Sequence, residues 1–298
     1  MSDAVGILAI VGLGLIGGSL ARALRERGAV QRVIGCGYRE PSLRRGLELG
    51  VIDEFTLDLD EALDRADTLV LCTPTLTASD VLEKILPRLS GGAGPLVTDV
   101  ASVKGSLYRT AVAAAGVMPP RLVLGHPIAG SERSGVDASR ADLFVNHRVI
   151  LTPVEDNDPD AVARVRAMWE LTGAEVVEMS VAQHDAVLAA TSHLPHVLAY
   201  ALVDALAAAP DSDEVFRCAA GGFRDFTRIA SSDPVMWRDI ALANREALLG
   251  AIDRFADHLQ QLRDAVDAGD AEGMHETFTR AKNARDAFAD ILADREKG

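Results

Sequence analysis

Three glycines near the N-terminus constrain the fold of this chain more than any other feature. The apolar run over residues 7–11 predicts a buried strand, and Gly12, Gly14 and Gly17 follow it with the spacing G-x-G-x-x-G. The first glycine permits a tight turn, the second lets the backbone approach a pyrophosphate, and the third lets a helix pack closely on the strand. The pattern predicts a strand, a turn and a helix that together bind a dinucleotide.

The helix that follows the glycine turn is predicted over residues 15–27. Its first backbone N–H groups, including those of Leu15 and Ile16, and the positive end of its dipole would face the phosphates. Further lining is expected from Thr73 and Pro74, which follow an apolar strand predicted over residues 68–72. Turns at such strand ends border the cofactor crevice in a doubly wound sheet.

The end of the second predicted strand, residues 32–37, bears on the choice between NAD and NADP. An acidic residue usually stands there and binds the ribose 2′-hydroxyl of NAD. This chain instead has Gly37, Tyr38 and Arg39. Because a guanidinium suits a 2′-phosphate, the sequence favours NADP over NAD. The alternative is that Arg39 is a solvated loop residue and that Glu40 binds the ribose.

The order of the predicted elements indicates an α/β fold with two domains. Short apolar strands alternate with helices up to about residue 180, which predicts a Rossmann-like, doubly wound, mostly parallel sheet over residues 1–180. Residues 181–298 are predicted to be all helix. The predicted helices span 181–209, 213–230, 234–268 and 270–294. Apolar residues on their faces favour packing between subunits: Leu198, Leu202, Ala205, Leu206, Leu242, Leu249 and Ile252.

Composition limits the partners and the compartment. The formal net charge of -14 over 298 residues argues against nucleic acid and anionic membranes, so anionic ligands must be bound by a few local cations. The three cysteines are scattered without metal or disulfide spacing, the N-terminus lacks a basic signal region, and no apolar segment is expected to reach transmembrane length. These features predict a soluble cytoplasmic protein.

Residues at two strand ends are the first candidates for chemistry. His126 follows a strand predicted over 122–124, and Ser102 follows one predicted over 96–100, so both would lie near a nicotinamide. The alternatives are a hydrogen-bonded loop histidine, and a serine that caps the helix predicted over 104–115.

The helical half offers further candidates. Arg224 or Arg228 is suited to clamp a carboxylate, the alternative being an ion pair with Asp225 or Asp233. His193 and His196 are three residues apart, but Pro195 disrupts the helix and no third ligand stands at a suitable spacing, so no metal site is predicted.

Six motifs in order along the chain resemble those of the prephenate dehydrogenase family, with its arogenate and cyclohexadienyl branches. They are VGLGLIGGS (11–19), TDVASVK (98–104), GHPIAGSERSG (125–135), SHLPH (192–196), GFRDFTR (222–228) and DPVMWR (233–238). The resemblance implies that the helical domain mediates dimerisation and that the active site lies in the cleft between the domains. The family's usual acid at the second strand end falls at Gly37 here.

The resemblance also implies roles for individual residues. His126 matches the catalytic histidine that hydrogen-bonds the substrate's ring hydroxyl, Ser102 a serine that assists at this hydroxyl and the nicotinamide, and Arg228 the arginine that binds a substrate carboxylate. His196 and Ser192 match positions that line the substrate side. Glu132 matches an acid at the cleft mouth, and Trp237 matches an aromatic residue near the pocket.

The implied reaction is the oxidative decarboxylation of prephenate to 4-hydroxyphenylpyruvate with hydride transfer to NAD(P)+ in L-tyrosine biosynthesis. In the cyclohexadienyl branch arogenate is a second substrate, and L-tyrosine is a feedback inhibitor in many members. One alternative is an arogenate-specific dehydrogenase. A β-hydroxyacid dehydrogenase would use a lysine in its helical domain, whereas residues 181–268 contain none. A non-catalytic dinucleotide sensor is the distant alternative.

Overall fold

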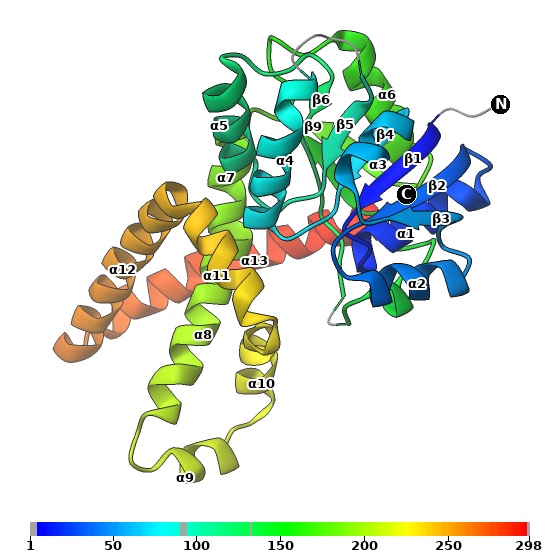
Figure 1. Ribbon diagram of the computed structural model, residues 1–298. Coiled ribbons are helices and arrows are strands. Elements are labelled where there is room, and N and C mark those ends of the chain that lie inside the picture. The colour runs from blue at the N-terminus through cyan, green and yellow to red at the C-terminus, as the bar shows by residue number, and fades with distance from the viewer. Residues whose placement is uncertain (1–4, 90–93, 132, 297–298) are drawn as a thin grey trace. The chain divides into compact units, whose positions relative to one another are not determined.

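The computed structural model describes residues 5–89, 94–131 and 133–296 (Figure 1). The chain divides into two compact units, Met1–Arg245 and Glu246–Gly298. This division is a different one from the domain boundary predicted at residue 180, which stays a prediction. The first unit continues past that point because α7 (Val181–Leu188) packs on α5 (Lys104–Ala115), and α11 (Pro234–Ala243) packs on α4 (Thr75–Leu89).

The first unit is built on a six-stranded sheet in which every neighbouring pair is parallel, as the sequence predicts. The strand order is β3-β2-β1-β4-β5-β6, so the chain winds outward in both directions from the centre of the sheet. The bounds are β1 (Gly6–Val11), β2 (Val30–Cys36), β3 (Glu54–Thr56), β4 (Thr68–Leu71), β5 (Leu96–Asp99) and β6 (Leu122–Val123). Only β3 was not predicted, because three residues are too few to show a strand pattern.

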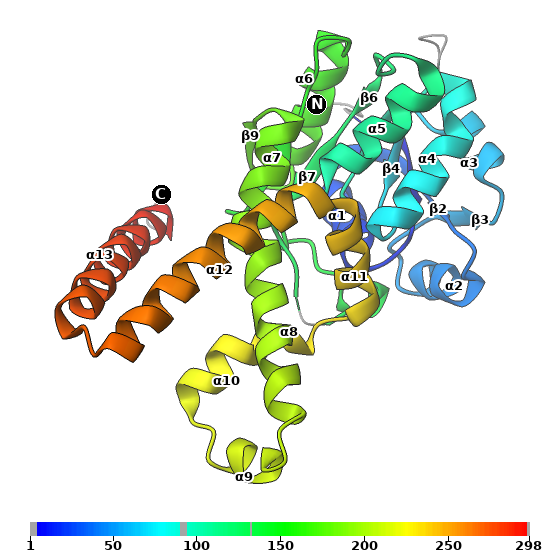
Figure 2. The ribbon, with the colours of Figure 1, turned by 90° about the vertical axis from the view of Figure 1, so that its left-hand side faces the viewer.

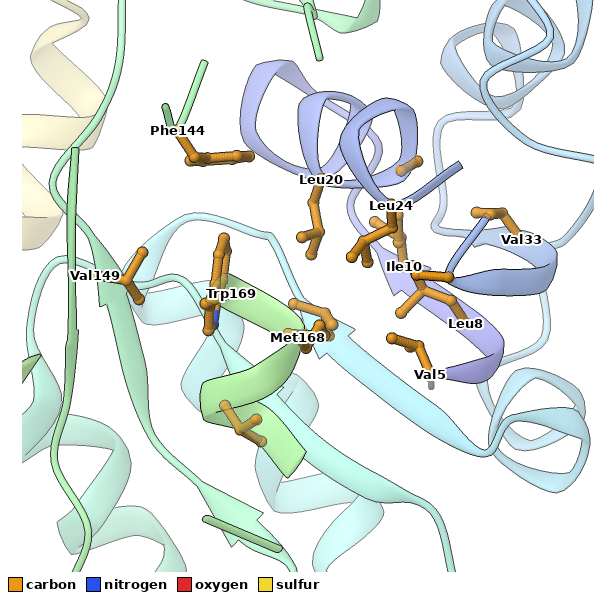
Figure 3. Close-up of a cluster of buried hydrophobic side chains, with 14 of the residues drawn as sticks. Val5, Leu8, Ile10, Leu20, Leu24, Val33, Phe144, Val149, Met168 and Trp169 are labelled. Atoms are coloured by element: carbon orange, nitrogen blue, oxygen red, sulfur yellow. The ribbon is translucent and has the colours of Figure 1, made fainter. Parts of the chain in front are cut away.

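Helices cover both faces of this sheet because its strands are apolar on both sides. Leu8 and Ile10 of β1 point toward α1 and α6, where Leu24 and Trp169 complete one core cluster (Figure 3). The intervening residues Ala9 and Val11 join a second cluster with α3, α4 and α5 on the opposite face. The helices not yet bounded are α1 (Leu15–Glu26), α2 (Glu40–Glu48), α3 (Leu59–Arg65) and α6 (Pro159–Glu170).

A second, three-stranded sheet follows directly after β6. Its order is β7-β8-β9, with β7 (Gly125–Pro127) antiparallel to β8 (Arg148–Leu151) and β8 parallel to β9 (Glu175–Glu178). His126 is therefore a strand residue, paired in register with Ile150, and not the loop residue that the sequence predicts. A single residue, Leu124, separates the two strands. The prediction missed β7 because a strand of three residues with proline and glycine carries no periodicity.

The remainder of the first unit is helical but more interrupted than predicted. The segments are α7, a π-helical turn η2 (Ala189–His193), α8 (Leu194–Ala207), α9 (Ser212–Arg217), α10 (Gly221–Thr227), a 3-10 turn η3 (Arg228–Ser231) and α11. The predicted single helix over 213–230 is wrong, since the chain breaks before Gly221. The predicted helix over 234–268 is also wrong, because Asn244 leaves helical geometry. Figures 1 and 2 show α9 at the far end of α8, with α10 returning beside α8.

The stretch Val181–Ala207 is long and apolar enough to cross a membrane by length and composition, contrary to the prediction that no segment reaches that length. Its polar residues tie it to the globular unit instead, since His184 and Asp185 bind β7 and α5 through hydrogen bonds. Several apolar side chains of the helical segments remain exposed, among them Leu202 and Leu242. These exposed faces are typical of helices that pack against another subunit.

The second unit consists of two long helices, α12 (Arg245–Ala268) and α13 (Ala271–Glu296). Gly269 adopts a φ of +65° at the turn between them, a backbone conformation that favours glycine. Apolar side chains are also exposed here, including Leu259 and Phe278.

Candidate active site

The glycine turn after β1 has the geometry of a phosphate cradle. Gly12 has a φ of +97°, and a Cβ at Gly17 would lie 2.7 Å from Ile10 Cγ2, so the first glycine makes the turn and the last allows helix and strand to touch. A Cβ at Gly14 would meet nothing within 4 Å, which leaves room for a ligand. Thr73 packs against the glycine turn, because a Cβ atom at Gly12 would lie 2.8 Å from Thr73 Cγ2.

Helix α1 presents free N–H groups at this turn. Gly14 at its N-cap has no side chain to bind them, and the first turn contains no acidic residue. The backbone amides of Leu15 and Ile16 are thus placed for an anion. The residues present fit the diphosphate of a dinucleotide, as the sequence predicts.

At the end of β2, no carboxylate stands where NAD-binding sites usually have one. Gly37 and the exposed residues Tyr38 (84% exposed) and Arg39 occupy the turn. The nearby carboxylate of Glu40 is occupied by Arg44, whose Nε lies 2.8 Å from Glu40 Oε1. Glu40 is therefore less suited to bind a ribose than a free acid would be.

His126 is buried and neutral. Its Nδ1 lies 2.9 Å from Nε2 of His184, and the two rings meet edge to face. Burial, with smaller contributions from the nearby His184 and Lys104, holds the pKa of His126 well below its usual range. A histidine in this state can accept a proton at neutral pH.

Behind His126, the hydrogen bonds continue to the start of α5. Nδ1 of His184 lies 2.8 Å from Asp185 Oδ1, and the Asp185 carboxylate accepts the backbone N–H groups of Lys104 (2.9 Å) and Gly105 (2.8 Å). Burial raises the pKa of Asp185, but the bonds from His184 and the two amides outweigh it and leave the pKa below its ordinary value. Asp185 is consequently a stable carboxylate.

A fully buried ion pair joins the two segments that carry Ser102 and His126. Lys104 Nζ donates to the Asp99 carboxylate and, at 2.6 Å, to the carbonyl oxygen of Gly125. Asp99 also accepts the backbone N–H groups of Gly125 (3.1 Å) and Ala101 (2.9 Å). The β5–α5 turn and β7 are thereby fixed to each other.

Ser102 lies half-buried in the turn between β5 and α5. The N-cap of α5 is Val103, without a side-chain hydrogen bond, so the alternative that Ser102 caps this helix is wrong. In the described part of the chain the Ser102 hydroxyl forms no hydrogen bond, which leaves it open to a ligand.

A second group of predicted residues gathers around Trp237 of α11. The imidazole of His196 stacks on the Trp237 ring with centroids 3.4 Å apart, and its Nδ1 donates to the Ser192 carbonyl oxygen at 2.9 Å. His193 meets the edge of the same ring. The π-helical turn explains this grouping, because its extra residue shifts the helix face between His193 and the preceding α7.

Arg228 is exposed on η3 and lies close enough to His196 to lower its pKa, although burial is the larger cause. Arg224 is exposed and pairs with Asp225 at 3.3 Å, which matches the ion-pair alternative for that residue. Pro74 is exposed just before α4. Glu132 lies outside the described residues.

Comparison with known proteins shows the family to which the chain belongs. Residues 20–178 match the family model for the nucleotide-binding domain of prephenate dehydrogenase, and residues 180–280 match the model for its dimerization domain. The chain belongs to the prephenate dehydrogenase family. It is 38% identical to a prephenate dehydrogenase of Bacillus subtilis over 97% of this chain and 76% of that protein.

For two further members of the family, the alignment spans nearly the full length of this chain and of the relative. A cyclohexadienyl dehydrogenase of Zymomonas mobilis is 37% identical over 93% of this chain and 94% of its own length. The crystal structure of prephenate dehydrogenase from A. aeolicus in complex with hydroxyphenyl propionate and NAD+ superimposes with a TM-score of 0.87, at 38% identity, over 95% of this chain and 98% of that one.

Four of the buried polar residues in this prephenate dehydrogenase family member were not predicted from the sequence as site residues: Asp99, Lys104, His184 and Asp185. Asp99 and Lys104 lie inside the TDVASVK motif, so the motif contained a signal that strand-end reasoning assigned to Ser102 alone. The adjacent pair His184 and Asp185 follows no spacing rule. Its only sequence signal is a run of three polar residues, Gln183, His184 and Asp185, in an otherwise apolar helix.

The buried histidines predict how the stability of this enzyme changes with pH. His193 is 1% exposed, and burial lowers its pKa from 6.5 to about 4. A histidine whose folded pKa is depressed contributes fully to stability above the unfolded pKa, and the contribution is lost as pH falls from 6.5 toward 4. We expect His193→Asn to reduce the loss of unfolding free energy between pH 7.5 and pH 5 by about 2 kcal/mol.

Urea denaturation at fixed protein concentration measures this difference. The matched control is His147→Asn, which makes the same substitution at an exposed histidine. Equal pH dependence in the wild type and His193→Asn would contradict the prediction.

Proposed function

We propose that this chain oxidatively decarboxylates prephenate to 4-hydroxyphenylpyruvate with hydride transfer to a nicotinamide dinucleotide, in L-tyrosine biosynthesis in the cytoplasm. The observation that carries the proposal is the buried, neutral His126, held on a short strand at the carboxyl edge of the dinucleotide-binding sheet. The chain's membership of the prephenate dehydrogenase family supports the substrate class.

The chemistry needs few groups from the protein. Prephenate is a cyclohexadienol with a carboxylate on the ring carbon opposite the hydroxyl. When bound, the oxidised nicotinamide accepts the hydride from the carbon that bears the hydroxyl. His126 takes the hydroxyl proton, the ring carboxylate departs as carbon dioxide and leaves its electron pair in the ring, and the proton returns to the phenolate oxygen. Aromatisation supplies the driving force.

The other site residues take roles in binding and orientation. Ser102, whose hydroxyl has no hydrogen-bond partner among the described residues, hydrogen-bonds the same ring hydroxyl from the β5–α5 turn. Arg228 binds a substrate carboxylate, with His196 and Trp237 beside it and Ser192 supporting His196. Glu132 takes the place of the acid at the cleft mouth, on the strength of the GHPIAGSERSG motif alone.

His126→Asn tests the proton acceptor. Asparagine places its side-chain amide near the position of Nδ1 and keeps a group for His184, but removes Nε2. We expect kcat to fall about 10²–10⁴-fold, the range for general acid–base catalysis, while binding of the reduced cofactor is unchanged. Steady-state kinetics and fluorescence titrations with NADPH and with NADH measure the two effects. His147→Asn, on the surface, is the control, and a near-normal kcat in His126→Asn would remove His126 from the mechanism.

The cofactor preference is proposed to lie with NADP, supported by Gly37 and by the exposed Arg39. Initial rates across prephenate or arogenate, each with NAD or NADP, test both choices. Arg39→Ala should raise the KM for NADP about tenfold and leave that for NAD unchanged, since only NADP offers a 2′-phosphate for the guanidinium. Arg27→Ala, another exposed arginine of this domain, is the control. A wild type that uses NAD alone would refute the assignment, and activity on arogenate alone would make the enzyme an arogenate dehydrogenase.

We further propose that the enzyme works as a homodimer and that L-tyrosine competes with the substrate. The match to a dimerization domain and the exposed apolar faces support the dimer.

L-Tyrosine shares its ring and side-chain carboxylate with the reaction product. It should raise the apparent KM for prephenate without changing kcat, and Arg228→Ala should raise both this KM and the tyrosine concentration for half-inhibition about tenfold or more. An unchanged KM in Arg228→Ala would exclude Arg228 as the clamp.

A further inference from the structure

We propose that Asp185 and His184 are positioning residues that hold His126 in the tautomer with a free Nε2. The three side chains form one line of hydrogen bonds, from the Asp185 carboxylate through His184 to His126 Nδ1. The catalytic consequence rests on the proposed function of His126 as the proton acceptor, whereas the tautomer itself does not.

The line has one direction because Asp185 can only accept. Its Oδ1 receives the N–H of Lys104 and its Oδ2 that of Gly105, so the carboxylate is held in place from the backbone of α5. Oδ1 also lies 2.8 Å from His184 Nδ1. An ionised carboxylate has no proton to give, so His184 Nδ1 must carry the hydrogen in this bond.

The tautomer of His184 then determines that of His126. With its proton on Nδ1, neutral His184 has a bare Nε2, which can only accept. The group 2.9 Å away is His126 Nδ1, which must therefore donate. This leaves His126 Nε2 without a proton. The opposite tautomer of His126 would place two lone pairs against each other in a buried site, which is unfavourable.

A protonated His184 would reverse this arrangement, because it would donate to both neighbours. The surroundings disfavour that state. His184 is completely buried, and the Lys104 side chain contributes a second positive charge nearby, so the pKa of His184 lies below its ordinary value despite the bond to Asp185. The charges that face the pair are Lys104, Asp99 and Asp185, with His193 beside them.

The arrangement also stabilises the proton once His126 has taken it. Nε2 receives the substrate hydroxyl proton while Nδ1–H remains donated to His184. The positively charged His126 ring is then connected to the negative charge of Asp185 through two hydrogen bonds, by way of His184. Because Asp185 grips the first two amides of α5, and Ser102 lies just before that helix, one carboxylate orients both groups that meet the ring hydroxyl.

The tautomer can be observed without any turnover. We expect long-range ¹H–¹⁵N spectra of the ligand-free, ¹⁵N-histidine-labelled enzyme at pH 7.5 to show His126 with a protonated Nδ1 and an unprotonated Nε2. The His126→Asn variant assigns the signal by its loss. A protonated Nε2 on His126 would overturn the proposal.

Substitutions of His184 separate positioning from folding. Glutamine can place an acceptor oxygen where His184 Nε2 lies, whereas phenylalanine fills the space without one. We expect His184→Phe to lower kcat about 10²–10⁴-fold with the KM for prephenate within about threefold, and His184→Gln to recover at least about tenfold of the loss. Melting temperature and the binding of NADPH or NADH confirm that each variant is folded.

Asp185→Asn completes the test from the other end of the line. In one of its two orientations, the asparagine amide presents its NH₂ group to His184 Nδ1. His184 would then carry its proton on Nε2 and donate it to His126 Nδ1. The fraction of His126 with a protonated Nδ1 should therefore fall in the spectra. Equal kcat in His184→Phe and His184→Gln would overturn the proposal. A wild type inactive on prephenate and arogenate would instead refute the proposed function, and the spectra would still decide the tautomer.

Discussion

The buried pair of Lys104 and Asp99 connects the parts of the structure on which the site is built. Both side chains are inaccessible to solvent, and between them they bind the turn after β5 and the backbone on either side of Gly125. A buried ion pair adds little net stability, because desolvation offsets the attraction, but removing one partner leaves an uncompensated charge. Its value here is geometric, since its hydrogen bonds join β7 to the turn after β5.

The N-terminus of α5 performs three tasks within a few residues. Ser102 precedes it, the Lys104 side chain reaches β7, and the first amides hold the Asp185 carboxylate of the helical segment. A carboxylate suits that place because it meets the positive end of the helix dipole. His126, Ser102 and the start of α7 are therefore positioned by the same short stretch of chain.

The sequence predicts what is local and misses what is not. Glycine spacing and apolar runs are contained in windows of a few residues, so the parallel sheet, the α1 turn and the placement of His126 beyond β6 could be predicted. The hydrogen bond between His126 and His184 joins residues 58 positions apart in the sequence, and that between Gly105 and Asp185 joins residues 80 positions apart. No local pattern in these segments predicts which residues they contact. The break at Asn244 has the same origin, because its side chain binds Asp185 and His193 rather than continuing a helix.

The proposed proton acceptor and the proposed carboxylate-binding residue lie in different environments: His126 is buried, whereas Arg228 is exposed. The proposed chemistry favours this difference. A histidine that must accept a proton at neutral pH works when burial keeps it neutral, and His126 and His184 are both enclosed. In the proposed function, Arg228 would have to attract a dianionic substrate to a chain of net charge -14, and its exposed position on η3 leaves its charge accessible from solvent. The stacked rings of His196 and Trp237 lie near Arg228 and present flat ring surfaces, which would suit the ring of the proposed substrate.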